Sequence, residues 1–456
     1  MIRSLAELAR VADGVLHGAD APFAAVTIDS RTLEPGSLFV ALRGERFDGH
    51  QFVPDVQARG AAGALVERPA ATALPQVVVR DALAGLTAFA SAWRAAFDGR
   101  VVGVTGSNGK TTVKEMLGAI LACEGATLVT RGNLNNHIGV PLTLCRLERT
   151  HQYAVIEMGA NHRQEIAHLA SIARPDVGLV INAGPAHLEG FGGLDGVAQG
   201  KGEMFEALGA GGTAVINADD RYASFWHGLA RGAGRVLTFG VRERADFSAR
   251  NVGSIAAGGD FATEFDLVTP VGEGRVRLAL AGEHNVMNAL AAAAAAHGAG
   301  ARLDAIIEGL GRMRAVAGRL EVKQLPGGAR LIDDSYNANP ASVRAGLRAL
   351  SALEGEHWLV LGEMRELGEE SPRLHAEIGE FARSCGVTRL LAVGDEAHHA
   401  VETFGAGATW FKGVEDMTAV LASELRPGVT VLVKGSRSNR LERVAEALGA
   451  GGGRVH

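Results

Sequence analysis

Residues 101–112, VVGVTGSNGKTT, combine an apolar run with glycines, a lysine and two threonines, a pattern typical of phosphate-binding loops. Lys110 would reach the β and γ phosphates of a nucleotide, the Thr111 hydroxyl would bind Mg²⁺, and loop N–H groups would face phosphate oxygens. The generic motif has a glycine where Val104 stands, which points to a subclass; the alternative is a plain glycine-rich strand-to-helix turn. The Gly-Lys-Thr-Thr ending favours nucleotide binding. The residues of this stretch expected to bind the nucleotide are Thr105, Gly106, Ser107, Asn108, Gly109, Lys110, Thr111 and Thr112.

Two later apolar stretches end in groups that can bind a metal ion. Glu157 closes the segment YAVIE, and His187 follows the segment VGLVINAGPA. A carboxylate at the end of a strand near a phosphate loop is where a Mg²⁺ ligand is needed, because the metal neutralises the transferring phosphoryl group. His187 has two open interpretations, a metal ligand or a hydrogen-bonded loop histidine.

Lys201 lies at an unusual position for a lysine. In the helical segment GVAQGKGEMFEAL it follows Val197 by four residues and so shares the apolar face of that helix. The side chain could bend out to solvent, which is the usual outcome for a lone lysine. Alternatively it points inward, loses its proton and reacts with carbon dioxide to form an anionic carbamate that binds Mg²⁺.

Two further polar clusters could contact a ligand. His284, Asn285 and Asn288 begin the helical segment EHNVMNALAAAAAA, where asparagines either pair with a purine edge or cap the helix. Near the N-terminus, the loops at residues 29–32 and 43–52 hold several hydrogen-bond donors close together. These loops could bind an anion or could be solvated turns.

The elements that must position these groups indicate an α/β chain of three domains, as expected for 456 residues of which 47% are apolar. Residues 1–99 read as short strands and turns followed by a helix from about Asp81. Residues 100–314 alternate strands with helices, which implies a mostly parallel sheet of the P-loop type. Residues 315–456 begin with a hairpin turning at residues 326–328 and continue as a second, Rossmann-like parallel α/β domain.

The amino-acid composition limits the classes of partner that the protein could bind. The net charge of -6 and the absence of basic runs argue against nucleic acid or an anionic membrane surface as the main partner. No apolar run reaches the ~18 residues that a membrane span needs. The cysteines lack metal or disulfide spacing, so we expect a cytoplasmic protein. They are Cys123, Cys145 and Cys385.

These motifs together resemble the Mur ligases of peptidoglycan synthesis, and the resemblance covers all three predicted domains. It rests on TGSNGKTT, KGEMF, HNVMNALAAAA, AGRLE and DDSYNANP. The resemblance implies ATP and Mg²⁺ as cofactors, Arg319 reaching the ATP phosphates, Asp334 near the ribose, and Asn285 and Asn288 near the adenine. It also implies the metal ligands Thr111, Glu157, His187 and Lys201 as its carbamate.

The outer segments resemble the branch of the family that adds D-alanyl-D-alanine to UDP-N-acetylmuramoyl-tripeptide, and no DNPR motif of the diaminopimelate-adding sister enzyme is present. DSRTLEPGSLFVALRGERFDGHQF would surround the UDP-sugar, and RGNLNNHIGVPLTL would hold the muramyl peptide. The residues implied for this substrate are Ser30, Arg31, Asp48, Gly49, His50, Asn135 and Asn136. The alternatives are a sister Mur ligase, a folylpolyglutamate synthetase or an ATP-hydrolysing switch.

The implied reaction phosphorylates the terminal carboxylate of the tripeptide to an acyl phosphate, which the amine of D-alanyl-D-alanine then attacks. The residues implied as catalytic are Lys110, Lys201, His187 and Arg319. All the motifs lie in one chain, so a monomer would suffice, and the third domain would close over ATP.

Overall fold

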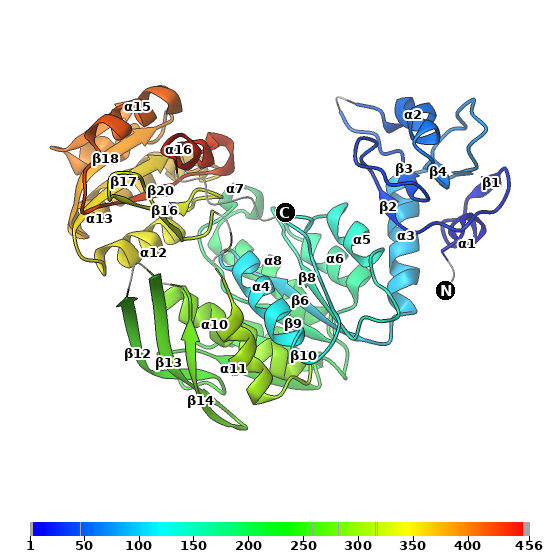
Figure 1. Ribbon diagram of the computed structural model, residues 1–456. Helices are drawn as coiled ribbons and strands as arrows, with labels where there is room; N and C mark the ends of the chain where they lie inside the picture. Colours follow the sequence, from blue (N-terminus) through cyan, green and yellow to red (C-terminus); the bar gives the residue numbers. More distant parts are fainter. Residues whose placement is uncertain are drawn as a thin grey trace.

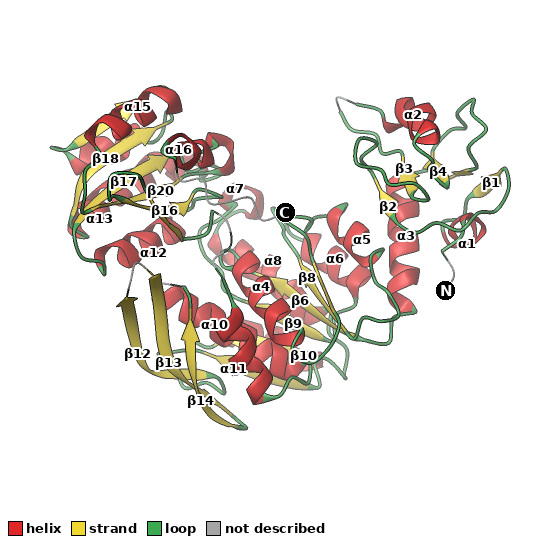
Figure 2. Ribbon diagram, in the orientation of Figure 1, coloured by secondary structure: helices red, strands yellow, loops and turns green. Residues whose placement is uncertain are grey.

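Four β-sheets organise the described part of the chain in this computed structural model, which covers residues 3–45, 47–257, 260–280, 282–314, 316 and 318–449 (Figures 1 and 2). Ala315, the expected first residue of the third domain, lies outside the described residues, as do both ends of the chain. The sheets of the N-terminal and C-terminal parts lie on opposite sides of the central sheet (Figure 1). The α/β class expected from the sequence is confirmed.

The N-terminal sheet has the strand order β1-β5-β4-β3-β2, and only β1 is antiparallel to its neighbour. Asp81 caps the longest helix of this part, since its side chain accepts a hydrogen bond from the Ala84 N–H at 2.9 Å. The elements are α1 (Leu5–Val11), β1 (Val15–His17), β2 (Val26–Thr27), β3 (Leu38–Val40), α2 (Val53–Ala58), β4 (Gly63–Val66), β5 (Gln76–Val78) and α3 (Ala82–Ala95).

The central sheet is parallel throughout, with the order β11-β10-β9-β6-β8-β7. Its strands are almost wholly buried because helices cover both faces, which explains their continuous apolar runs. The elements are β6 (Arg100–Thr105), α4 (Lys110–Leu121), β7 (Thr127–Val129), α5 (Gly139–Leu144), β8 (Tyr153–Glu157), α6 (Glu165–Ala173), β9 (Val177–Val180), α7 (Leu188–Phe191), α8 (Leu194–Glu206), β10 (Thr213–Asn217), α9 (Ala223–Leu229), β11 (Arg235–Phe239), α10 (Glu283–Gly298) and α11 (Leu303–Arg312).

A small antiparallel sheet, β12 (Ser248–Ala257), β13 (Asp260–Thr269) and β14 (Gly272–Leu278), was not anticipated from the sequence. Its inner residues Phe265, Leu267, Val276 and Leu278 are fully buried and join the core that α4 and α10 share. This sheet therefore covers a helical layer of the central part rather than extending the parallel sheet.

The C-terminal sheet has the order β15-β16-β20-β17-β18-β19. Only β15 is antiparallel, and it pairs with β16 through the hairpin that the sequence predicts at residues 326–328. The elements are β15 (Glu321–Gln324), β16 (Arg330–Asp334), α12 (Pro340–Ser351), β17 (Glu356–Gly362), α13 (Ser371–Ser384), β18 (Val387–Val393), α14 (His398–Phe404), β19 (Ala408–Phe411), α15 (Val414–Glu424), β20 (Val429–Lys434) and α16 (Glu442–Ala447).

One hydrophobic cluster spans the N-terminal and central parts. It runs from Leu5 and Phe89 to Val101 and Trp226, a further cluster around Phe39 and Val53 lies within the N-terminal part, and the clusters of the C-terminal part contain only residues beyond 319. Arg94 of α3 reinforces the junction by donating hydrogen bonds to central-domain carbonyls. Of the helices in the described residues, none has the length and apolar composition that crossing a membrane requires.

Candidate active site

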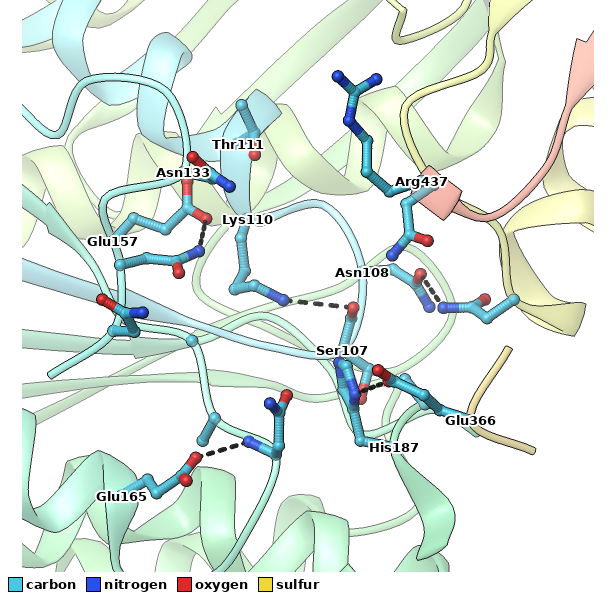
Figure 3. Close-up of a pocket in the computed structure, with 18 of the residues that line it drawn as sticks. Ser107, Asn108, Lys110, Thr111, Asn133, Glu157, Glu165, His187, Glu366 and Arg437 are labelled. Carbon is cyan, nitrogen blue, oxygen red and sulfur yellow. Dashed lines mark hydrogen bonds and ion pairs between the residues drawn. The ribbon is translucent and has the colours of Figure 1, made fainter. Parts of the chain in front are cut away.

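A cavity of about 1130 Å³ lies between the central and C-terminal parts, and residues of both line it (Figure 3). The central part contributes the loops that follow β6, β8 and β9, which are neighbours in the sheet. Ligands of parallel α/β sheets bind at these carboxyl ends, because the loops there converge. A second cavity of about 410 Å³ adjoins the first and shares Asn108, Gly109, Thr111, Arg319 and Ser342 with it.

The phosphate loop connects β6 to α4. Gly109 has a φ of 84°, and a Cβ there would lie 2.5 Å from the Asn288 side-chain oxygen, so only glycine fits. Lys110 bends back over the loop and donates to the Gly106 carbonyl at 2.6 Å. Burial lowers the pKa of Lys110, and the charge of Glu157 opposes that shift.

The backbone of the phosphate loop is bound to the segment that follows β9. The Asn108 N–H donates to the Asn182 side chain at 2.9 Å, and the Asn182 amide donates back to the Asn108 carbonyl at 3.2 Å. The Ser107 hydroxyl exchanges hydrogen bonds with Gly184 at 3.0 and 3.1 Å. The loop is thus held in place by the adjacent strand end before any ligand binds.

Glu157 ends β8 beside the phosphate loop and is 2% exposed. One carboxylate oxygen accepts a hydrogen bond from Asn135 at 2.7 Å, and the other lies 3.6 Å from the Lys114 ammonium. Lys114, also buried, was missed from the sequence. Its spacing of four residues from Lys110 on α4 was the available signal, because that spacing puts both lysines on one helix face.

His187 comes from the loop after β9 and has a left-handed backbone, with φ of 54°. Its Nδ1 contacts the carboxylate of Glu366, which belongs to the C-terminal part (Figure 3). Burial lowers the pKa of His187, whereas Glu366 acts in the opposite direction. The sequence did not predict Glu366, because the two residues meet only across the cavity between domains.

Lys201 of α8 points inward, as one of its two interpretations predicted, and is 1% exposed. Its Nζ donates to the carbonyl of Ala160, a residue of the cavity wall, at 3.1 Å and lies 5.1 Å from the Phe191 ring centre. Burial, and then the charge of Lys110, lower the pKa of Lys201 well below its usual value. A neutral amine is the form that reacts with carbon dioxide.

The second cavity lies where α10 faces the C-terminal part. Asn285 and Asn288 are buried there, and Asn288 donates to Asn285 at 3.1 Å. The Arg319 guanidinium lies 4.1 Å from the Tyr336 ring centre and borders both cavities.

Asp334 forms a buried ion pair at the wall of the second cavity. Its carboxylate accepts a hydrogen bond from Lys434 at 2.5 Å. Burial raises the pKa of Asp334, against the effect of the neighbouring lysine. Lys434 was not predicted as a site residue, because its strand, β20, follows β16 by about a hundred residues and pairing of the two strands is not readable from spacing.

The structure separates the predicted substrate residues into two groups. Asn135 and Asn136 line the large cavity, and Asn136 also accepts hydrogen bonds from the Ile138 and Gly139 N–H groups. The five N-terminal residues line neither of the two cavities described above. They are Ser30, Arg31, Asp48, Gly49 and His50.

Two carboxylates of these N-terminal loops are held by arginines. Asp48 accepts hydrogen bonds from Arg68 and His50, and these contacts lower the pKa of Asp48. Arg31 forms an ion pair with Asp29 at 2.7 Å, which lowers the pKa of Asp29 to about 2. These loops are therefore constrained by local ion pairs and lie outside both cavities.

Over 447 residues the chain is 46% identical to the UDP-N-acetylmuramoyl-tripeptide--D-alanyl-D-alanine ligase of Escherichia coli (strain K12), and the match covers 98% of both chains. The chain belongs to the Mur ligase family. Three Mur ligase family models match along it: the family's catalytic domain at residues 22–91, the middle domain at residues 104–296 and the glutamate ligase domain at residues 318–437.

Solved Mur ligase structures have the same architecture. A crystal structure of MurF from Acinetobacter baumannii matches with a TM-score of 0.90 and 35% identity, covering 98% of this chain and 99% of that one. MurF ligase from Thermotoga maritima in complex with ADP matches with a TM-score of 0.81 and 29% identity, covering 93% and 96%. The arrangement of the sheets is thus that of this family.

Proposed function

We propose that the chain is an ATP-dependent ligase that joins D-alanyl-D-alanine to UDP-N-acetylmuramoyl-tripeptide, giving UDP-N-acetylmuramoyl-pentapeptide, ADP and phosphate in peptidoglycan precursor synthesis. The observation that carries the proposal is the 46% identity to the Escherichia coli ligase across 98% of both chains. The cavity between the central and C-terminal parts agrees with it, because a ligase must bring a nucleotide and two further substrates together.

The chemistry requires activation of a carboxylate, which is a poor electrophile in water. The γ-phosphoryl group of ATP would pass to the terminal carboxylate of the tripeptide, and the amine of the dipeptide would then form the amide bond as phosphate leaves. Lys110 and Arg319 would stabilise the negative oxygens during the transfer. Closure of the C-terminal part would keep water from the acyl phosphate.

The donor groups beside the phosphate loop fit Mg²⁺, which prefers oxygen ligands. The Glu157 oxygen that faces Lys114 is buried and accepts no hydrogen bond from the described residues, as expected for an oxygen reserved for a cation. Thr111 and Glu157 would hold one Mg²⁺ ion. His187 and the carbamate form of Lys201 would hold a second. When bound, Mg²⁺ would neutralise phosphate charge.

The remaining assignments extend this proposal along the chain. Residues 1–99 would bind the UDP-sugar, residues 100–314 would bind ATP, and residues 315–456 would close over ATP and bind D-alanyl-D-alanine. In the second cavity, Asn285 and Asn288 would contact the adenine and Asp334 the ribose side. The enzyme would act as a cytoplasmic monomer, since the groups proposed for catalysis come from one chain.

Phosphate release by the purified protein tests this function. The assay contains ATP, Mg²⁺ and UDP-N-acetylmuramoyl-tripeptide, with or without D-alanyl-D-alanine, and mass spectrometry identifies the product. We expect release that requires both substrates and yields the pentapeptide. Release without the dipeptide would indicate an ATP-hydrolysing switch, and release only with a single amino acid would indicate a sister ligase.

A further inference from the structure

The phosphate loop has one side chain that reaches into the C-terminal part. The side-chain oxygen of Asn108 accepts a hydrogen bond from the side-chain amide of Asn339 at 2.7 Å, joining residues 231 positions apart in the sequence. Asn339 is 8% exposed and Asn108 is half-buried, so this contact is partly shielded from water. Because the backbone of Asn108 is already bound to Asn182, only its side chain is available to reach across the cavity.

Asn339 is itself fixed by the start of α12. Its side-chain oxygen accepts a hydrogen bond from the Ser342 N–H at 2.9 Å, and its own N–H donates to the Ser342 hydroxyl at 3.0 Å, which is a reciprocal capping box. Since the oxygen is used in the cap, the amide NH₂ group must point away from the helix. The cap therefore aims the donor at the phosphate loop.

We propose that Asn339 is a positioning residue for nucleotide binding, which latches the first turn of α12 onto the phosphate loop through Asn108. Asn108 borders both cavities, and Asn339 borders the larger one. The latch sets the distance between the loop that carries Lys110 and the C-terminal residues that face the same nucleotide. It raises the population of the arrangement that binds the nucleotide from both sides.

Two substitutions separate the latch from the helix cap. Asn339→Ser keeps a good capping oxygen but is too short to reach Asn108, whereas Asn339→Ala removes both the cap and the latch. We expect both variants to bind a non-hydrolysable ATP analogue with Mg²⁺ about three- to tenfold more weakly, the effect of one neutral hydrogen bond. Only the alanine variant should melt a few degrees lower without nucleotide.

A double-mutant cycle tests whether the partner is Asn108. Asn108→Ala removes the acceptor and borders the nucleotide site itself, so it should weaken analogue binding about three- to tenfold less in the Asn339→Ser background than in the unaltered protein. If the two substitutions weakened analogue binding additively, the latch would be overturned. The same variants should raise the KM for ATP about three- to tenfold in the phosphate-release assay.

The inference rests on the proposed nucleotide site, and isothermal titration of the full chain distinguishes the two. If the unaltered protein failed to bind the analogue, the nucleotide site and the latch would both be overturned. If it bound the analogue and Asn339→Ser bound it with equal affinity, the latch alone would be wrong and Asn339 would be only a helix cap.

Discussion

Lys201 lies in an environment that is unusual for a lysine, because its side chain is buried. An ammonium group this deeply buried would need a close carboxylate partner, yet the hydrogen bond that the structure gives its Nζ goes to a neutral carbonyl. The lowered pKa follows from that burial and from the nearby charge of Lys110. Conversion to a carbamate would turn this amine into the anion that a second Mg²⁺ needs.

Lys201→Ala tests that role. Turnover should fall by about 10²-fold or more, the usual cost of losing a group that stabilises transition-state charge, while the ATP analogue binds within about threefold of normal. Phosphate release and isothermal titration measure the two effects. A short carboxylate such as acetate should restore part of the activity by supplying an anion in the vacated space. Full activity in the variant, with no added anion, would contradict the carbamate.

His284 predicts a pH dependence of stability. Burial, with a smaller effect of Lys434, lowers the pKa of His284 from 6.5 to about 4. Between these values the unfolded chain binds the proton and the folded chain does not, so this contribution to stability is complete above pH 6.5 and is lost as the pH falls toward 4.

Urea unfolding of the unaltered protein and of His284→Gln checks this dependence. Between pH 7 and 5 the free energy of unfolding should fall by about 2 kcal/mol more in the unaltered protein than in the variant, which has no proton to take up. Equal slopes in the two proteins would show that His284 is accessible to protons in the folded state.

At the scale of the element, α10 combines a long run of buried residues with small side chains. Residues 291–296 are six alanines, each with no exposed surface, packed between α4, the central sheet and the small antiparallel sheet. The methyl groups let these layers approach closely. The amphipathic pattern of a surface helix is absent, since this helix is enclosed on every side.

Ala293→Leu should therefore overpack the layers and lower the free energy of unfolding by about 1–3 kcal/mol or more. Met287→Leu on the same helix, a volume-conserving change at a half-buried position, serves as the control and should cost less than about 1.5 kcal/mol. Thermal or urea unfolding measures both. Equal stability of the two variants would mean that the packing around Ala293 leaves enough space for a leucine side chain.

The elements that the sequence predicted best are those with a strong local signal. The strand, glycine turn and lysine of the phosphate loop, the helix that Asp81 caps and the hairpin at residues 326–328 all form as expected. The sheet β12–β14 was missed although a signal was available: Phe265 and Leu267 on β13, like Val276 and Leu278 on β14, alternate with less buried residues, which is the pattern of a half-buried strand. Contacts between domains, such as Asn108 with Asn339, have no local signal at all.

At the scale of the whole molecule, the residues that line the cavities come from two parts of the chain, the central part and the C-terminal part, whose hydrophobic clusters are separate. The central part holds the phosphate loop, while Arg319, Tyr336 and Glu366 reach the same space from the C-terminal part. Ligands between two such bodies favour the closed arrangement, because contacts to both are made only there.

Small-angle X-ray scattering should therefore give a smaller radius of gyration with an ATP analogue and UDP-N-acetylmuramoyl-tripeptide than without them. The N-terminal part should follow the central part in this movement, because α3 and Arg94 fix the two together. A protein whose scattering profile is the same with and without both ligands would exclude closure as a step of the reaction.

The hydrophobic cluster that the N-terminal and central parts share also affects how the molecule unfolds. Leu5, Phe89 and Trp226 belong to one cluster, so unfolding of one part removes packing from the other, whereas the C-terminal clusters are separate; a smaller cluster around Phe39 lies within the N-terminal part alone. We therefore expect the three domains to unfold as two cooperative units. In a calorimeter the chain should show two heat-absorption peaks, and a fragment cut after residue 99 would expose the side chains that it contributes to the shared cluster.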